Sequence, residues 1–411
     1  MDGKAHDVSD EPLARRPDVS VDESFDILRD PYPMFAARRA EAGVFRGSVM
    51  DWSKAADMMP ENLYAAVSYD AVNRVFRDGK TFDSNIYDNT IGLFIGPTIL
   101  AMEGKAHREH RNLVSAAFKT RSLARWEPEI VRPVVNTLID EFIETGNADL
   151  VRDFTFEFPT RVISKLLGLP EEDLAWFRTR AVSLISYHVK FKKAFEASAE
   201  LKDYFIKQID LRRSTPTEDI IGDLVSADID GEKLTDEAIY SFLRLLLPAG
   251  LETTYRSSSN LLYLLLTNPA QFAAVQNDRE LIGPAIEEGL RFETPLTTVQ
   301  RSATEATVLD GVDIPEGAVI DVCIGSANRD EARWENAETF DIFRKRVPHI
   351  SFAAGEHTCL GLHLARMETR VALECMLDRM TDIQLVDEGD PHIHGQPFRS
   401  PNVLPVTFAS V

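Results

Sequence analysis

The longest helical pattern in the chain runs from Thr235 to Asn268. It opens with Thr235-Asp236-Glu237, a capping residue followed by a first turn that suits the helix dipole, and Asn268-Pro269 ends it. At 1.5 Å per residue such a helix is about 50 Å long, the full width of a domain of this size. We therefore expect the other elements to pack around this one helix.

This helix contains a break at Pro248-Ala249-Gly250-Leu251-Glu252-Thr253. Proline removes the hydrogen bond to the carbonyl of Arg244 and clashes with that turn, so we expect the helix to kink or open there. Glu252 and Thr253 follow directly, in a stretch that is otherwise apolar. A buried carboxylate needs a partner or a task. Two interpretations are open: an ion pair with Arg256 four residues on, or a role in catalysis.

A second constraint is the stretch Phe352-Ala-Ala-Gly355-Glu-His357-Thr-Cys359-Leu-Gly361. Apolar residues recur after it at three- and four-residue steps, which predicts a helix that begins near Cys359. The unpaired N–H groups of such a helix end should lower the pKa of the thiol towards the thiolate. A thiolate in this position can be a nucleophile, a metal ligand or neither.

This stretch resembles the haem-binding loop of the cytochrome P450 family, with Cys359 in the place of the axial thiolate ligand of the iron. The resemblance covers nearly the whole chain. Ala353 stands where the family usually carries glycine, a change that we expect to tighten the loop and keep the ligand. The resemblance implies a haem b cofactor. The other residues that it places against the haem ring are Phe352, Gly355, Gly361, Ala249 and Gly250.

Three further segments match the family in its order along the chain. His107 and Arg111 are four residues apart and share one helix face, and the match implies that they bind the haem propionates together with Arg301 and His349. Ala249-Gly250-x-Glu252-Thr253 matches the oxygen-activation segment, which implies that Glu252 and Thr253 pass protons through water. Pro248 departs from that segment and leaves the water path open. Glu288 and Arg291 match a structural ion pair that braces the fold behind the haem.

The resemblance also locates the substrate. Residues 83–100 form an apolar loop broken by glycines, which is unusual on a surface and covers the substrate in the family; plain core packing is the alternative. The helices near residues 171–210 correspond to a mobile lid, with contacts at Phe177, Ile185, Tyr187 and Val189. The expected substrate contacts are Ile86, Tyr87, Leu93, Phe94, Leu245, Pro248, Thr297, Val299 and Phe398.

Composition limits the binding partners and the cellular compartment that we expect for this protein. A formal charge of −21 argues against nucleic acid and against an anionic membrane surface. The three cysteines imply no disulfide framework and favour the cytoplasm. No apolar run of eighteen residues occurs, so we expect a soluble protein. Residues 1–28 are expected to form a flexible tail and residues 29–411 a single haem-binding domain, mainly α with a small β region, with the haem between the long helix and the cysteine helix.

The resemblance implies a monomeric monooxygenase that inserts one atom of O2 into a C–H bond of a small hydrophobic substrate, such as a terpenoid, steroid, fatty acid or aromatic compound. The sequence carries no flavin or iron–sulfur pattern, so a separate ferredoxin and ferredoxin reductase are the expected electron donors. The expected docking patch consists of Lys105, Arg108, Lys119, Arg125 and Arg366. Two alternatives remain: a peroxide-driven peroxygenase and a haem-thiolate ligand sensor without turnover.

Overall fold

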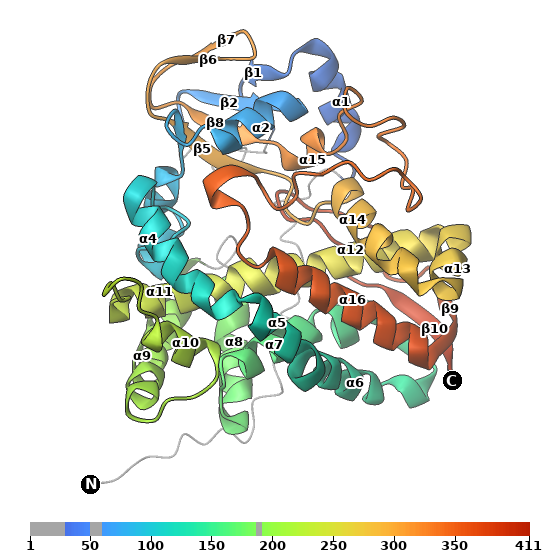
Figure 1. Cartoon of the computed structure of the whole chain (residues 1–411). Helices are drawn as coiled ribbons and strands as arrows, with labels where there is room; N and C mark the ends of the chain where they lie inside the picture. Colours follow the sequence, from blue (N-terminus) through green and yellow to red (C-terminus); the bar gives the residue numbers. More distant parts are fainter. Residues whose placement is uncertain (1–28, 50–59, 186–190) are drawn as a thin grey trace.

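The helix predicted from Thr235 to Asn268 crosses the middle of the molecule (Figure 1). The computed structural model describes residues 29–49, 60–185 and 191–411. The long helix consists of α11 (Asp236–Leu246), the π-helical turn η9 (Leu247–Glu252) and α12 (Thr253–Thr267). The hydroxyl oxygen of Thr235 caps α11 by accepting a hydrogen bond from the N–H of Ala238 at 3.1 Å. The predicted opening at Pro248 is confirmed, because the π turn falls on that residue.

Shorter helices surround this axis. Those that precede it are α1 (Tyr32–Glu41), α2 (Tyr69–Arg77), η3 (Asn85–Asn89), α3 (Gly92–Ile95), α4 (Gly104–Ser115), η4 (Ala116–Phe118), α5 (Thr120–Trp126), η5 (Glu127–Val131), α6 (Arg132–Asp140), η6 (Ile143–Thr145), η7 (Leu150–Thr155), α7 (Glu157–Leu166), η8 (Glu171–Asp173), α8 (Leu174–Ile185), α9 (Phe191–Ser214) and α10 (Ile220–Ser226). Those that follow it are α13 (Pro269–Asn277), η10 (Arg279–Leu281), α14 (Ile282–Phe292), α15 (Ile324–Ala327), η11 (Gly355–His357) and α16 (Leu362–Arg379).

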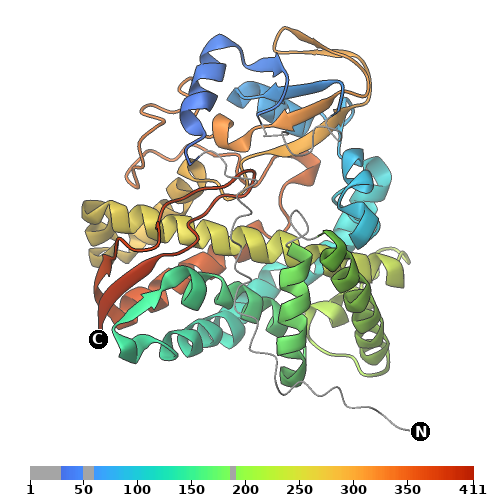
Figure 2. The ribbon, with the colours of Figure 1, turned by 180° about the vertical axis from the view of Figure 1, so that it is seen from behind.

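The strands form small sheets. The larger sheet has the order β1 (Val44–Arg46), β2 (Leu63–Ala66), β8 (Val319–Val322), β5 (Val299–Ala303) and β3 (Phe82–Asp83). In it β2 and β8 are parallel and the other pairs are antiparallel. A second sheet has the order β4 (Asn147–Asp149), β10 (Pro405–Ser410) and β9 (Met380–Leu385), and β6 (Thr307–Leu309) pairs with β7 (Val312–Ile314). Figures 1 and 2 show the larger sheet at one end of the molecule and most helices at the other.

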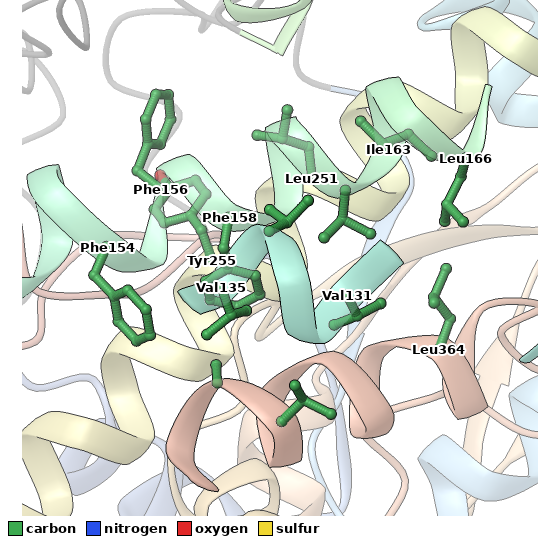
Figure 3. Close-up of a cluster of buried hydrophobic side chains, with 14 of the residues drawn as sticks. Val131, Val135, Phe154, Phe156, Phe158, Ile163, Leu166, Leu251, Tyr255 and Leu364 are labelled. Atoms are coloured by element: carbon green, nitrogen blue, oxygen red, sulfur yellow. The ribbon is translucent and has the colours of Figure 1, made fainter. Parts of the chain in front are cut away.

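The largest apolar core joins the long helix to α16 (Figure 3). Val131 and Val135 from η5 and α6, Leu251 and Tyr255 from the long helix, and Leu364 from α16 are all buried in it. Fully burying a side chain of this kind stabilises the fold by about 1.5–3 kcal/mol. The core therefore fixes α16, and the loop that leads into it, against the long helix.

The fold class expected from the sequence is confirmed: one mainly helical domain with small sheets. The expected tail, residues 1–28, lies outside the described residues. In the part of the chain that the structure describes, no helix has both the length and the apolar character needed to cross a bilayer.

Candidate active site

The cysteine loop is closed by its own backbone. The N–H of Cys359 donates to the carbonyl of Phe352 at 2.9 Å, and the N–H of Thr358 donates to the carbonyl of Gly355 at 3.2 Å. The helix that follows begins at Leu362 with Gly361 as its N-cap, close to the start predicted near Cys359. In Figures 1 and 2 this loop lies between the larger sheet and the long helix.

Two positions in the loop have left-handed backbone conformations. Gly355 has φ +74°, and a Cβ there would meet the carbonyl oxygen of Phe76 at 2.4 Å. Ala353 has φ +57°, a conformation that costs a residue with a side chain about 1–2 kcal/mol. Glycine is the residue that suits this backbone, so the alanine strains the loop at the position where the resemblance already marked a departure.

Cys359 is exposed, as are Gly355 and Glu356, and most other residues of the loop are half-buried. Desolvation by the surrounding protein raises the pKa of its thiol above the ordinary value, and the N–H of Gly361 and the charges of Arg111 and Arg366 only partly oppose the rise. The predicted fall in this pKa is therefore wrong: the N–H of Gly361, the N-cap of α16, does lower the pKa, but desolvation outweighs that effect. A bound metal cation would deprotonate the thiol outright.

The long helix also presents open surface at its break. Ala249 is exposed and Gly250 and Thr253 are half-buried, although most of their helix is buried. The hydroxyl of Thr253 donates to the carbonyl of Ala249 at 2.7 Å. This bond leaves the lone pairs of the hydroxyl oxygen able to accept a hydrogen bond from water.

Glu252 is buried, with 5% of its surface exposed. Its Oε1 accepts hydrogen bonds from Nη2 of Arg256 at 2.9 Å and from Nε at 3.3 Å. Nη1 of the same guanidinium donates to the hydroxyl of Ser400 at 3.0 Å. The ion pair that the sequence left as one interpretation is therefore present, and it ties the carboxylate to the C-terminal segment of the chain.

Basic and imidazole side chains gather beside the cysteine loop. The rings of His107 and His357 are stacked with centroids 4.2 Å apart, and Arg111 donates to the carbonyl of Thr358. Both ring nitrogens of His107 are buried without a hydrogen-bond partner. Desolvation, with help from His357 and Arg111, lowers the pKa of His107 to about 4, so this ring is neutral at pH 7.

Arg301 belongs to the same region through its neighbours. Its guanidinium lies over the rings of Phe76 and Tyr87. The charge of Arg301 acts on Asp83, and so does that of Glu103, whose carboxylate lies 3.3 Å from His357. Among the residues that the structure describes, neither Arg111 nor Arg301 forms an ion pair. Unpaired guanidinium groups and an orphaned imidazole provide donors for two carboxylates, so these side chains fit the propionates of a haem.

His349 also lies against the cysteine loop, with its ring centroid 6.0 Å from that of Phe352. Its Nε2 is 3.4 Å from Oε2 of Glu287, which also accepts from Arg366 at 2.9 Å. Although burial opposes ionisation, the interactions with His349 and Arg366 hold the pKa of Glu287 at about 2. The expected propionate partner therefore faces α14 and α16. His357 is a site residue that the sequence did not single out, although its position two residues before the cysteine was a usable signal.

The expected substrate residues divide into three sets by exposure. Leu93 is 59% exposed, and Ile86, Tyr87, Val299 and Phe398 are half-buried. A third set is buried: Phe94, Leu245, Pro248 and Thr297. Phe177 is also buried, and Tyr187 and Val189 lie outside the described residues.

Thr297 is held by the C-terminal segment. Its N–H and its hydroxyl donate to the carbonyl of Pro397 at 2.8 and 3.0 Å, and the residue is completely buried. Leu296 forms a β-bridge with Phe398. In this structure Thr297 anchors the turn that carries Phe398, because none of its surface is left to face a cavity.

Glu288 and Arg291 form the ion pair expected from their spacing. The guanidinium donates to both carboxylate oxygens, at 2.7 and 2.8 Å, and also to the carbonyls of Asn328, Ala337 and Thr339. The pair is buried and joins α14 to the segment that follows α15.

Comparison with known proteins gives a consistent result. The family model described as Cytochrome P450 matches residues 174–394. Cytochrome P450 monooxygenase PikC of Streptomyces venezuelae is 32% identical, over 93% of this chain and 92% of its own. The structure of CYP109Q5 from Chondromyces apiculatus has a TM-score of 0.85 at 31% identity and covers 94% of this chain and 97% of its own. CYP109E1 from Bacillus megaterium in complex with testosterone has a TM-score of 0.83 at 29% identity, with 92% and 99% covered.

Proposed function

The chain belongs to the cytochrome P450 family and is a monooxygenase of that family, and from this premise we propose that it oxidises a C–H bond of a small hydrophobic substrate. One atom of O2 enters the product, and a separate ferredoxin with its reductase supplies the electrons. Members of this family bind haem through a cysteine thiolate, and the bound haem supplies the oxidising chemistry.

The observation that carries this proposal is the position of Glu252 and Thr253 at the open turn of the long helix. Thr253 is hydrogen-bonded to the exposed Ala249, and Glu252, the residue before it, is buried. An acid and an alcohol in sequence can move a proton from one side of a helix to the other through water. A protein that only binds a ligand has no need for such a pair.

Cys359 is the proposed haem ligand, and His107, Arg111 and Arg301 are the proposed propionate partners. We add His357 to this set because its ring stacks on that of His107. We remove His349 because it lies against Phe352 and Glu287 rather than in the cluster of His107, His357 and Arg111. Phe352, Gly355 and Gly361 on one side, and Ala249 and Gly250 on the other, are the proposed contacts of the ring. The three glycines among them let the backbone approach a flat cofactor closely.

Arg256 controls the proton path in this proposal. Its hydrogen bonds to Oε1 of Glu252 hold the carboxylate on the side of Ser400, to which Arg256 also donates. Glu252 must therefore exchange Arg256 for water when it passes a proton on. The hydroxyl of Thr253 then accepts a hydrogen bond from that water and orients it. Pro248 supports the arrangement because it removes one N–H from the helix ladder.

The proposed substrate is neutral and hydrophobic. The half-buried candidates on three separate segments are apolar or aromatic: Ile86 and Tyr87, Val299, and Phe398. The related CYP109E1 was crystallised with testosterone and with corticosterone, which makes steroids the first class to test.

The test is an optical titration of the haem-loaded ferric protein with testosterone, a fatty acid, a terpenoid and a simple aromatic compound. We expect at least one class to shift the Soret band saturably towards the high-spin form and then to yield a hydroxylated product with a ferredoxin and its reductase. A thiolate-ligated protein that shifts with none of the four would contradict the hydrophobic-substrate proposal. Turnover with peroxide but not with ferredoxin would favour the peroxygenase alternative.

The docking patch expected from the sequence is largely neutralised. Lys105, Arg108, Arg125 and Arg366 lie within 4 Å of a carboxylate each, with Glu109, Glu356, Glu218 and Glu287 as partners. Lys345 and Arg346 form no ion pair or hydrogen bond among the described residues, and they line a hollow of about 290 Å³ that Arg366 also borders. We therefore place the ferredoxin contact at these two residues, because acidic partners are attracted by unpaired cations.

Charge reversal tests this placement. Lys345→Glu with Arg346→Glu should slow electron transfer from ferredoxin and flatten its salt dependence, whereas Lys105→Glu with Arg125→Glu is the matched control on paired residues. Equal effects of the two double variants would contradict the assignment.

A further inference from the structure

The short helix α3 is stabilised by a residue of the long helix. α3 has a single turn, Gly92–Ile95, and a helix of this length does not form alone. The last carbonyl groups of α3 receive no hydrogen bond from within the helix. Nη1 of Arg244 donates to the carbonyl of Phe94 at 3.1 Å, and Nη2 donates to that of Ile95. The guanidinium therefore caps α3 from α11, where a positive charge also suits the helix dipole.

The same guanidinium reaches a third element. Nη1 donates to the hydroxyl of Ser198 on α9 at 2.8 Å, and that hydroxyl donates in turn to the carbonyl of Phe94. Phe94 and Ser198 are separated from Arg244 by 150 and 46 positions in the sequence. One side chain thus joins α3, α9 and α11. From the sequence, α3 is expected to cover the substrate, α9 to belong to the lid and α11 to carry the substrate contact Leu245.

The hydrogen bonds of Arg244 go to neutral groups, although Glu237 and Tyr240 also favour its charge. Arg244 is 6% exposed, and its described hydrogen-bond acceptors are carbonyls and hydroxyls, with no carboxylate among them. Desolvation lowers the pKa of Arg244 to about 10, so the group stays charged at pH 7. Burying a charge is costly unless hydrogen bonds compensate for the lost water, so loss of these acceptors would destabilise the junction.

The chain after α3 is fitted closely around this junction. Gly96 has φ +86°, and a Cβ there would meet Oγ of Ser241 at 2.7 Å and Nη2 of Arg244 at 3.4 Å. A residue with a side chain at position 96 would therefore push the end of α3 away from α11. The close packing of Arg244 at the end of α3 therefore depends on glycine at position 96.

We propose that Arg244 is a positioning residue that latches α3 and α9 together and so controls which ligands reach the pocket and how fast. The inference rests on the proposed function, because the pocket is the one that lies beside the haem. A bulky ligand must displace α3 and break the junction, whereas a compact ligand passes without doing so. The latch therefore discriminates between ligands by size, because it slows the entry of bulky ligands more than that of compact ones.

The experiment compares two probes, imidazole and the bulkier 4-phenylimidazole, which both bind ferric haem and shift the Soret band. In Arg244→Met we expect the association rate of 4-phenylimidazole to rise about tenfold, the factor for one lost net hydrogen bond, with the rate of imidazole nearly unchanged. Arg212→Met is the control: it removes another buried guanidinium that donates to carbonyls, those of Leu167 and Gly168, and has no hydrogen bond to α3. Arg212 differs from Arg244 in that it also pairs with Asp219 at 2.9 Å.

Hydrogen exchange provides a readout that does not depend on haem chemistry. The N–H groups of Ile95 and Gly96 donate within the turn to Ile91 and Gly92 and should exchange about tenfold faster in Arg244→Met, but not in Arg212→Met. Should Arg244→Met fail to fold, Gly96→Ala opens the same junction with the arginine intact and should give the same two changes.

Unchanged exchange at Ile95 and Gly96, or an equal rise in the rates of both probes, would overturn the latch. These outcomes are distinguishable from a failure of the proposed function, which would appear as the absence of a thiolate-type ferrous carbon monoxide spectrum in the unmutated protein.

Discussion

The guanidinium of Arg256 holds the carboxylate of Glu252 through two hydrogen bonds, at 2.9 and 3.3 Å, one helical turn apart on the long helix. Arg256 also lies over the rings of Tyr255 and Phe398, with its carbon 5.0 and 5.6 Å from their centroids. The acid of the proposed proton path and the turn that carries a proposed substrate contact therefore share one side chain. A ligand that moves Phe398 would act on the partner of Glu252.

The first prediction concerns this ion pair. Arg256→Met leaves a buried carboxylate without its cation and should reduce the free energy of unfolding by about 3 kcal/mol. The double variant Arg256→Met with Glu252→Gln should recover much of that loss, because no uncompensated charge remains. Denaturant unfolding of the four proteins measures the coupling. If the two single effects were simply additive, the pair would not be acting as a unit.

The second prediction concerns Thr253. Thr253→Ala removes the hydroxyl that we assign to orienting water, so electrons should still be consumed while most of the product is lost. Thr253→Ser keeps a hydroxyl and should retain most of the product. The measurement is the ratio of product formed to reduced nicotinamide consumed. A ratio that stayed the same in Thr253→Ala would contradict the assignment, and a ligand sensor would show no product in any variant.

The third prediction concerns backbone strain in the cysteine loop. Ala353→Gly relieves a left-handed alanine and should increase the free energy of unfolding by about 1 kcal/mol. Gly355→Ala places a Cβ 2.4 Å from the carbonyl oxygen of Phe76 and should reduce it by about 2 kcal/mol or more. Thermal unfolding of the haem-loaded protein checks both. Effects of the same sign would contradict the strain argument.

The fourth prediction concerns Glu368, which is buried on α16 and forms no ion pair or hydrogen bond in the described part of the chain. Desolvation raises the pKa of its carboxyl to about 8. The folded state keeps this proton between about pH 5 and pH 8 while the unfolded state has lost it, so stability falls as pH rises, by about 1.4 kcal/mol per pH unit.

Glu368→Gln should remove that part of the pH dependence and be relatively more stable at pH 8 than at pH 5. Glu374 on the same helix is a suitable control. Arg132 and Arg370 hold the pKa of Glu374 below its ordinary value against the effect of burial, so Glu374→Gln should leave the slope above pH 5 unchanged. Urea unfolding at several pH values gives the slopes, and a wild-type slope that survives in Glu368→Gln would rule the idea out.

The fifth prediction separates two histidines. His357→Ala should weaken haem retention, because His357 stacks on His107 and holds it beside the loop. His349→Ala should affect haem retention less, since His349 lies against Glu287 and Phe352, outside the cluster of His107, His357 and Arg111. Transfer of haem to an apo-globin measures the loss rate in each variant. A larger effect at His349 would restore the propionate assignment first made from the sequence.

Much of this protein follows from local sequence. The long helix, its opening at Pro248, the pairs Glu288–Arg291 and Glu252–Arg256 and the closed cysteine loop each depend on residues that are near neighbours along the chain. Helix period, proline geometry and spacings of three or four residues act over that range, and they are the same in any fold.

The tertiary structure decided the relationships that join distant segments. The sequence gives no spacing that would join Arg244 to Phe94, stack His357 on His107 or bury Thr297 against Pro397. The pKa of Cys359 also depends on the protein packed around the thiol, because the desolvation it causes outweighs the N–H of Gly361 at the helix end. Contacts of this kind form only when packing brings separate elements together, because burial and long-range hydrogen bonds depend on the whole fold.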